Sequence, residues 1–203
     1  PLQMGEDSFN HTPLAKPKHF TPPNFTLNPE QRNRSMGLLD GKVAIITGAG
    51  GGIGREHARA MAKEGAAIVV NDLGGARDGE GSGSAMADGV VDEIKALGGE
   101  AVANYDNVST VEGGEAILKT ALDAFDHVDI LVNNAGILDS ANWRLSMEVN
   151  IIAVMTGSDI AMQRMKKSPK KGSIVNIAST AGFLTGMGER STGYFVSKPF
   201  QEL

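Results

Sequence analysis

A glycine-rich segment at Thr47–Gly54 is the first part of the sequence with residue types that could bind a ligand. It directly follows the aliphatic run Val43–Ile46 and precedes a helical pattern, which is the context in which a GxGxxG-type loop holds a pyrophosphate. The glycines of such a loop permit a tight turn, let backbone N–H groups approach the ligand and allow close helix–strand packing. The N-terminus of the helix adds a partial positive charge. The sequence therefore predicts a dinucleotide site with contacts from Gly48, Gly50, Gly52, Ile53 and Gly54.

A second candidate binding residue is Asp72, which ends the next aliphatic run eighteen positions beyond Gly54. A carboxylate at this distance can accept hydrogen bonds from both ribose hydroxyls of an adenosine. The 2′-phosphate of NADP would meet a like charge there, at a cost of about a few kcal/mol. We therefore expect NAD as the cofactor, while an ordinary aspartate that caps a turn stays the alternative.

Four motifs in a fixed order give the sequence a family resemblance. They are the loop at Thr47–Gly54, the Asn-Asn-Ala-Gly segment at Asn133–Gly136, a serine at Ser179 and the Tyr-x-x-x-Lys segment at Tyr194–Lys198. Together they resemble the short-chain dehydrogenase/reductase family of classical type, over about residues 37–203. The resemblance implies a Rossmann fold and hydride transfer between a nicotinamide cofactor and an alcohol or ketone.

Two subfamilies are similar to different parts of the chain. The segment Asn71–Gly75 and its Gly/Ser-rich continuation resemble the (3R)-hydroxyacyl-CoA dehydrogenase units of peroxisomal-type multifunctional enzymes. Asn133–Ile137, Asn142–Trp143 and Met147–Asn150 are spaced more like 15-hydroxyprostaglandin dehydrogenases. The subfamily stays open between these two.

The resemblance also implies four catalytic residues. Tyr194 would be the acid/base, Lys198 its partner, Ser179 the hydroxyl that orients the substrate and Asn150 the anchor of a proton-relay water. Further cofactor contacts would come from Asn107, Val108, Asn134, Ala135 and Gly136, together with Tyr194 and Lys198. Either Asp106 or Asn107 would reach the adenine beside Val108. For Asn133–Gly136, the alternative to cofactor contact is a purely structural role that fixes the loop after the fourth strand.

The chemistry of Tyr194 and Lys198 agrees with these roles. The two residues are four apart, so on a helix they share a face. A free tyrosine with a pKa of ~10 is a poor base at neutral pH. The Lys198 ammonium and a positive nicotinamide would both favour the phenolate and so lower that pKa.

The elements that must position these residues alternate between short aliphatic runs and helical patterns. This alternation is typical of βαβ units, and we predict an α/β doubly wound parallel sheet with strand order 3-2-1-4-5. Gly65 and Gly98 stand where helix C-caps are needed, and we expect Trp143 to pack within a helix. The predicted strands are Val43–Ile46, Ala67–Val70, Ala101–Tyr105, Ile130–Asn133 and Ser173–Ile177.

Composition narrows the function classes. The net charge of −5 argues against a nucleic-acid partner, and the lack of cysteine removes disulfides, thiolate metal sites and cysteine nucleophiles. His57 and His127 have no neighbouring ligand pattern, so we predict no metal site. No apolar stretch of ~18 residues is evident, which predicts no membrane span. Without a targeting signal, we expect a cytoplasmic location.

The two ends of the chain carry separate expectations. Residues 1–35 hold six of the eight prolines and no periodic pattern, so we predict a disordered extension before an NAD(P)-binding domain at 36–203. The chain ends at Leu203, and the resemblance implies that the domain is incomplete at this C-terminus. Members of the family are usually homo-oligomers.

Three functions stay open. The first is an NAD-dependent dehydrogenase of a secondary alcohol, either a hydroxyacyl thioester, a steroid or a hydroxy-lipid. The second is a nucleotide-binding fragment without catalytic competence. The third is a 3-oxoacyl reductase, which Asp72 disfavours if the reductase uses NADPH.

Overall fold

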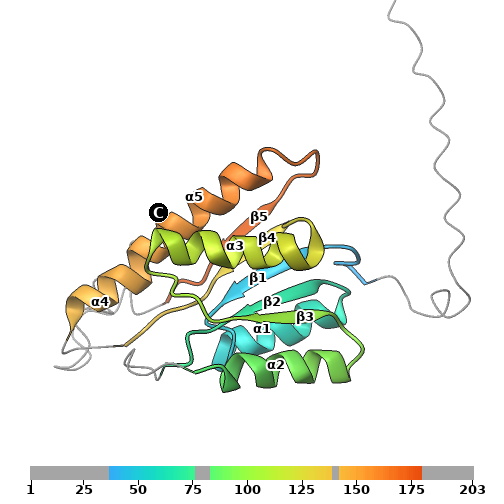
Figure 1. Cartoon of the computed structure of the whole chain (residues 1–203), viewed down its shortest axis with the longest axis horizontal. Coiled ribbons are helices and arrows are strands. Elements are labelled where there is room, and N and C mark those ends of the chain that lie inside the picture. Colours follow the sequence, from blue (N-terminus) through green and yellow to red (C-terminus); the bar gives the residue numbers. More distant parts are fainter. Residues whose placement is uncertain (1–36, 76–82, 139–141, 180–203) are drawn as a thin grey trace, which may run out of the picture. The chain divides into compact units, whose positions relative to one another are not determined.

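The computed structural model describes residues 37–75, 83–138 and 142–179 (Figure 1). Five parallel strands form one sheet in the order β3-β2-β1-β4-β5, which confirms the predicted order. The predicted strand boundaries are correct to within one residue. The strands are β1 (Val43–Thr47), β2 (Ala67–Asn71), β3 (Ala101–Asn104), β4 (Ile130–Asn133) and β5 (Ser173–Asn176).

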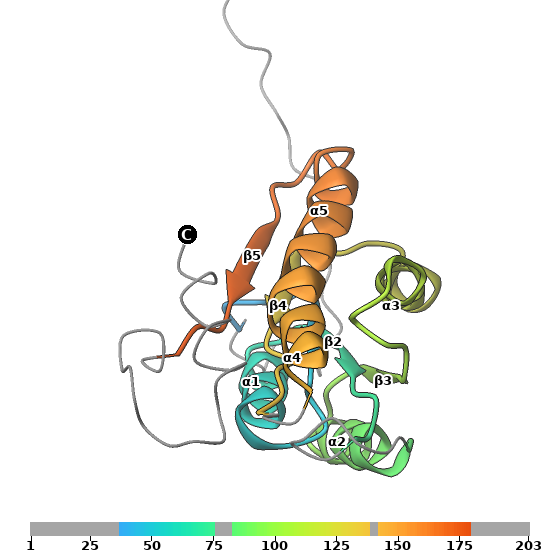
Figure 2. The same ribbon diagram turned by 90° about the vertical axis from the view of Figure 1, so that its left-hand side faces the viewer.

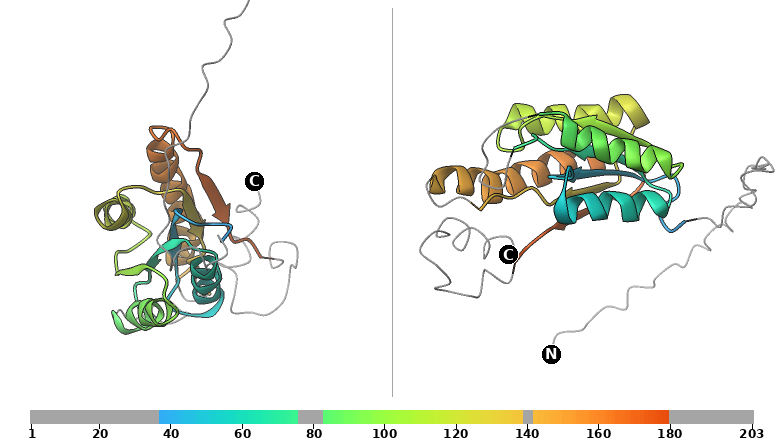
Figure 3. Two further views of the ribbon diagram at one scale, coloured as in Figure 1. Left: turned by 90° about the vertical axis from the view of Figure 1, so that its right-hand side faces the viewer. Right: turned by 90° about the horizontal axis from the view of Figure 1, so that it is seen from below.

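Helices cover both faces of the sheet, as Figure 2 and Figure 3 show. Helices α1 (Gly52–Lys63) and α2 (Ala85–Ala96) lie on one face. Helices α3 (Val111–Phe125) and α5 (Ala153–Met165) lie on the other. Between β4 and α5 the chain forms the short helix α4 (Trp143–Met147) and a π-helix, η2 (Glu148–Ile152). The predicted doubly wound α/β architecture is therefore confirmed.

The central strand β1 explains why the sheet forms where it does. All five of its residues are buried, because β1 pairs with β2 and β4 and has a helical layer on each side. Val43 and Ile45 pack into the core on the α3–α5 side, and Ala44 and Ile46 pack into the core on the α1–α2 side. A strand buried on both faces reads as a continuous aliphatic run, which is the pattern in the sequence.

Several helix ends follow their local sequence. Gly65 (φ +93°) and Gly98 (φ +79°) lie in the left-handed region after α1 and α2, as predicted for helix C-caps. Thr110 caps α3, because its side chain accepts the Gly113 N–H. The packing prediction for Trp143 is wrong: its side chain is 51% exposed, and the Arg144 guanidinium lies 4.4 Å from its ring centre. This tryptophan begins a one-turn helix, α4, and among the described elements α4 has its main contacts with η2, which follows it directly in the chain.

One helical segment, Trp143–Met165, is long and apolar enough to cross a membrane by length and composition alone. This finding corrects the expectation that the sequence has no such segment. Only a third of its most apolar window is buried, and Met155 is among its exposed side chains. Its α5 part packs against β4 and α3, as a helix that covers a sheet does.

Two glycines inside helices α2 and α3 make a matched test of how closely these helices approach their surroundings. A Cβ at Gly89 in α2 would have open space around it, whereas a Cβ at Gly113 in α3 would lie 1.9 Å from the Asn107 carbonyl oxygen. We expect Gly89→Ala to raise the free energy of unfolding by about 0.5–1 kcal/mol, since alanine favours a helix over glycine. We expect Gly113→Ala to lower it by about 2 kcal/mol or more. Urea unfolding measures both, and a stabilised Gly113→Ala would contradict the described contact.

Candidate active site

The carboxyl ends of β1 and β4 form the crevice in which an open α/β sheet binds its ligand. The chain leaves β1 towards β2 on one side, while β4 lies on the other side, so the strand order reverses between them. The glycine-rich loop follows β1 at this point, and the Asn134–Gly136 segment follows β4. The structure therefore brings two of the predicted cofactor-binding segments together.

The glycines of the loop are required by close contacts. Gly48 has φ +62°, and a Cβ there would lie 2.8 Å from the Ala135 Cα. A Cβ at Gly54 would lie 2.3 Å from the Gly48 carbonyl oxygen, and one at Gly50 would lie 2.8 Å from the Asp72 carboxylate. Gly52 has φ +52° with open space around it. The loop thus packs tightly beneath and leaves its backbone accessible above.

The N-terminus of α1 is suited to an anion. Its N-cap residue, Gly51, has no side chain to accept the first N–H groups, and no acidic residue lies in the first turn. No side chain of the helix's own first turn therefore neutralises the partial positive charge of this end, which favours phosphate binding there. Ile53, in this first turn, is 64% exposed. The residues present fit the pyrophosphate of a dinucleotide.

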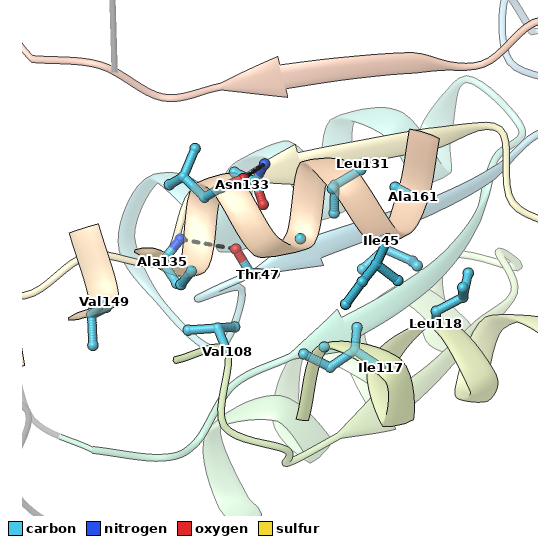
Figure 4. A pocket seen from close by; sticks show the side chains of 15 residues that line it. Ile45, Thr47, Val108, Ile117, Leu118, Leu131, Asn133, Ala135, Val149 and Ala161 are labelled. Carbon is cyan, nitrogen blue, oxygen red and sulfur yellow. Dashed lines mark hydrogen bonds between the residues drawn. The ribbon is translucent and has the colours of Figure 1, made fainter. Parts of the chain in front are cut away.

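Thr47 holds the two sides of the crevice together. Its buried Oγ1 accepts the backbone N–H groups of Asn134 (3.1 Å) and Ala135 (3.0 Å), as the dashed line to Ala135 marks in Figure 4. In return, the Asn134 Nδ2 donates to the carbonyl oxygens of Thr47 (2.9 Å) and Gly48 (3.0 Å). Six polar groups of the two loops satisfy one another in this way. The Asn134 side chain therefore has a structural role, because its amide holds the loop after β1.

Asp72 is the first residue after β2, and its carboxylate lies between two loops. Its Oδ2 accepts the Gly50 N–H (2.8 Å), and its Oδ1 accepts the Gly74 N–H (2.8 Å). These charge-assisted bonds fix the carboxylate beside the phosphate loop. Each oxygen keeps a lone pair for a further donor, such as a ribose hydroxyl.

The cationic residue next to the loop, Arg55, is paired with a carboxylate of another helix. Arg55 follows Gly54 directly, but its guanidinium makes a two-point contact with the Glu93 carboxylate of α2, with Nη2–Oε1 at 2.8 Å and Nε–Oε2 at 3.1 Å. Hydrogen bonding and the opposite charge raise the pKa of Arg55 and hold the pKa of Glu93 below its ordinary value. This pair joins α1 to α2 and leaves Arg55 committed to a carboxylate.

The residues predicted to surround the adenine lie after β3. The Asn107 Oδ1 accepts the Ser109 N–H (2.9 Å), so this side chain shapes the turn that leads into α3. The Asp106 Oδ2 accepts from the Asn104 Nδ2 (2.7 Å) and so belongs to a buried amide network. Val108 lines an apolar cavity between α3, α5 and the sheet. That Asp106 or Asn107 contacts the adenine stays a prediction, with both residues as candidates.

Asn150 lies in the π-helix η2 and is completely buried. Its Oδ1 accepts the Ile137 N–H (2.9 Å), and its Nδ2 donates to the Ile137 carbonyl oxygen (3.0 Å). The side chain therefore fixes the loop after β4, two residues beyond Ala135. π-Helical turns are frequent at functional sites because they displace the backbone from its regular hydrogen-bond partners.

The remaining catalytic candidates are only partly described. Ser179 is half-buried and follows the end of β5, at the same edge of the sheet as the phosphate loop. Tyr194 and Lys198 lie outside the described residues. Their catalytic roles stay a prediction.

Three residues have roles at the site that the sequence did not predict. Thr47 begins the predicted loop, but its type gives no signal of the bonds that it makes, since a threonine at a strand end is commonplace. Met86, at the start of α2, flanks the loop, because its Cβ lies 2.7 Å from where a Cβ of Gly50 would stand. Asn133 donates from Nδ2 to the Ser158 Oγ and the Asn176 Oδ1, both at 3.0 Å, and thereby joins β4 to α5 and β5. Only the polar strand end of Asn133 could have been noticed beforehand.

An apolar cavity of about 30 Å³ lies below the crevice, between α3, α5 and the sheet (Figure 4). Thr47 and Asn133 are its polar lining residues, and Ile117, Leu131 and Val149 are among the apolar ones. This volume holds about one or two waters. The cavity is therefore a packing gap beneath the crevice and is too small for a nicotinamide ring.

Comparison with known families decides what this crevice belongs to. Residues 42–200 match the family model of short chain dehydrogenases. The chain belongs to the short-chain dehydrogenase/reductase family. The resemblance seen in its motifs is thereby confirmed, and the chain is an oxidoreductase-family protein with a Rossmann-like fold.

Individual relatives of the family agree with this assignment. Over 160 residues and 75% of this chain, it is 46% identical to a short-chain type dehydrogenase/reductase of Mycobacterium tuberculosis, covering 56% of that protein. It is 47% identical over 160 residues, again 75% of this chain, to peroxisomal multifunctional enzyme A of Dictyostelium discoideum, of which it covers 35%. A solved structure of 7α-hydroxysteroid dehydrogenase in complex with NADH and 7-oxo glycochenodeoxycholic acid matches with a TM-score of 0.70 and 36% identity, over 79% of this chain and 61% of that one. The chain thus spans about half of the first relative's length.

The hydroxyl of Thr47 provides a sharp test of the crevice. We expect Thr47→Val to lower the free energy of unfolding by about 2–4 kcal/mol, because it leaves two backbone N–H groups without an acceptor. Thr47→Ser keeps the oxygen and should cost less than about 1 kcal/mol. Urea unfolding of the two variants beside the parent chain measures the difference. Equal stabilities of the valine and serine variants would show that the hydroxyl does not join the loops.

Proposed function

We propose that the protein is an NAD-dependent oxidoreductase that interconverts a secondary alcohol and a ketone. The observation that carries this proposal is the Asp72 carboxylate, fixed between Gly50 and Gly74 beside an uncapped helix N-terminus. A diphosphate fits the helix end, and ribose hydroxyls fit the carboxylate. The 2′-phosphate of NADP would face this carboxylate, and the nearby Arg55 is paired with Glu93.

The residues that would hold the dinucleotide come from three loops. Backbone N–H groups of the Gly48–Gly54 loop would donate to the pyrophosphate, and Asp72 would accept from the ribose. Asn107 or Asp106, with Val108, would border the adenine. Asn134, Ala135 and Gly136 would border the other half of the cofactor, and Thr47 would keep them in place through its two hydrogen bonds.

The proton chemistry would belong to the chain's own residues. When bound, the nicotinamide ring supplies the acceptor for a hydride from the substrate's carbinol carbon. Tyr194 would remove the hydroxyl proton as general base, with Lys198 stabilising the phenolate. Ser179 would donate to the substrate oxygen and orient it. Asn150 would act as a positioning residue, since both of its amide atoms bind the Ile137 backbone.

Relatives supply the proposed substrate class. One relative carries the name of a peroxisomal multifunctional enzyme, and one structural neighbour was solved with an oxidised bile acid. A hydroxyacyl thioester, a steroid or a hydroxy-lipid is therefore the substrate class that we propose. The cytoplasmic location expected from the sequence stays a prediction.

Turnover tests the proposed chemistry. We expect the chain to produce NADH from NAD⁺ and at least one member of a panel of 3-hydroxyacyl thioesters and hydroxysteroids. Tyr194→Phe should lower kcat by about 100-fold or more, since general acid–base catalysis contributes factors of 10²–10⁴. NADH production is followed by absorbance, and NADH binding by fluorescence.

The binding measurement distinguishes the explanations of an inactive variant. Tyr194→Phe should bind NADH as tightly as the parent chain does if its hydroxyl serves the substrate. Undiminished turnover in Tyr194→Phe would contradict the proposed base. NADH binding without turnover of any panel member in the parent chain would favour the nucleotide-binding alternative.

The hydrogen bond from the Gly74 N–H to the Asp72 carboxylate gives a second test with a matched control. Gly74 has φ +78°, and a Cβ there would lie 2.0 Å from the Gly83 carbonyl oxygen, whereas a Cβ at Gly83 would meet nothing within 4 Å. We expect Gly74→Ala to displace its N–H from the Asp72 Oδ1 and to weaken NADH binding about tenfold, the value of one hydrogen bond to a charged group. Gly83→Ala should bind NADH as the parent chain does. Equal affinities of the two variants, measured by fluorescence titration, would show that Gly74 does not position Asp72.

A further inference from the structure

The edge of the sheet opposite the crevice has a concentration of positive charge. Figure 1 shows the C-terminal ends of α3 and α5 at this edge, away from α4. The eight residues Arg164–Lys171 run from the last turn of α5 towards β5 and are called the α5–β5 connection below; they include five cationic residues and no acidic one. The whole chain has a net charge of −5, so this segment has the opposite sign to the rest of the protein.

These cations have no ionic partners in the described part of the chain. Arg55 and Arg59 pair with glutamates and Lys119 pairs with Asp123, whereas no ion pair joins any of the five cations of the α5–β5 connection to a described carboxylate. The C-terminus of α5 offers roughly half a unit of negative charge. That partial charge cannot balance five cations, so the segment attracts anions.

A cavity of about 230 Å³ lies against this segment. Arg164, Lys167, Ser168 and Pro169 line one side, and His127 and Val128 of the loop before β4 line the other. The Ser168 Oγ accepts the Lys170 N–H (3.2 Å), which leaves its hydroxyl hydrogen able to donate to a ligand. The space is more than ten times the ~10–15 Å³ that one water requires, and it is sufficient for a group the size of a diphosphate.

The buried carboxylate that follows the lining residues His127 and Val128 is already satisfied. Asp129 is buried, and its Oδ2 accepts the Val43 N–H (3.0 Å) and lies 3.1 Å from the His127 Nε2. Its Oδ1 lies 3.4 Å from the Lys42 Nζ. The His127 Nδ1 lies 2.8 Å from the Phe125 carbonyl oxygen, so both ring nitrogens have oxygen neighbours. Asp129 therefore does not neutralise Arg164 or Lys167.

We infer that this cavity is a second anion site, which binds a phosphate or diphosphate ester at the edge opposite the phosphate loop. The Arg164 guanidinium offers a planar fork for two phosphate oxygens, and the Lys167 ammonium provides a compact second charge. The Ser168 hydroxyl would donate a third bond. This site uses none of the residues of the proposed oxidoreductase site and does not depend on that function.

Pyrophosphate is the probe that tests the inference. The full chain is titrated at low salt, with NADH present throughout to occupy the phosphate loop, and backbone amides are followed by ¹H–¹⁵N NMR. We expect saturable shifts at Val128 and Ser168 with a Kd below about 1 mM. Arg164→Gln and Lys167→Gln should each raise this Kd tenfold or more. Lys119→Gln removes the same charge from an exposed site on α3 and should leave the Kd unchanged.

Three results would overturn the inference. Shifts that grow linearly without saturation would indicate an adventitious ion only. Saturable shifts confined to Gly50–Gly54 would place the pyrophosphate in the phosphate loop. A Kd that rises by the same factor in all three variants, Lys119→Gln included, would reduce the effect to the net charge of the surface.

Discussion

The structure depends on the mutual satisfaction of polar groups where β1 and β4 end. A loop that presents backbone N–H groups to a phosphate needs glycines, and glycines cannot hold the loop in place through side chains. Thr47, where β1 ends, and Asn134, after β4, hold the glycines in place instead. The threonine oxygen accepts two N–H groups from the β4 side, and the asparagine amide donates to two carbonyl oxygens on the β1 side. The crevice is rigid because each loop satisfies the other.

The surrounding fold brings the remaining groups to the same edge. Parallel pairing places the ends of β1, β2 and β4 side by side, so that Asp72 can reach the Gly50 N–H across 22 positions of sequence. The Arg55–Glu93 pair joins the two helices on one face, and Asn150 fixes the loop after β4 on the other side. Local sequence makes each element, but the site exists only where their ends meet.

The architecture could be predicted from the sequence more completely than the site could. Strands such as β1 are buried on both faces, so their aliphatic runs are unmistakable, and the boundaries differ by one residue because Thr47 and Asn71 are polar yet paired. The loop glycines and Asp72 were found because their roles are local to a strand–turn–helix unit. The partners of Thr47 and Asn150 were not, since each bond joins a side chain to a distant backbone group. Trp143 was misjudged because an apolar side chain does not reveal whether a layer covers it.

The central claim is that the Asp72 carboxylate makes this crevice a site for NAD in preference to NADP. The most direct measurement is a fluorescence titration of the chain with NADH and with NADPH, with Asp72→Ala as the comparison. We expect the chain to bind NADH at least about tenfold more tightly than NADPH, and Asp72→Ala to lose most of this preference. Equal or tighter binding of NADPH by the unaltered chain would contradict the account.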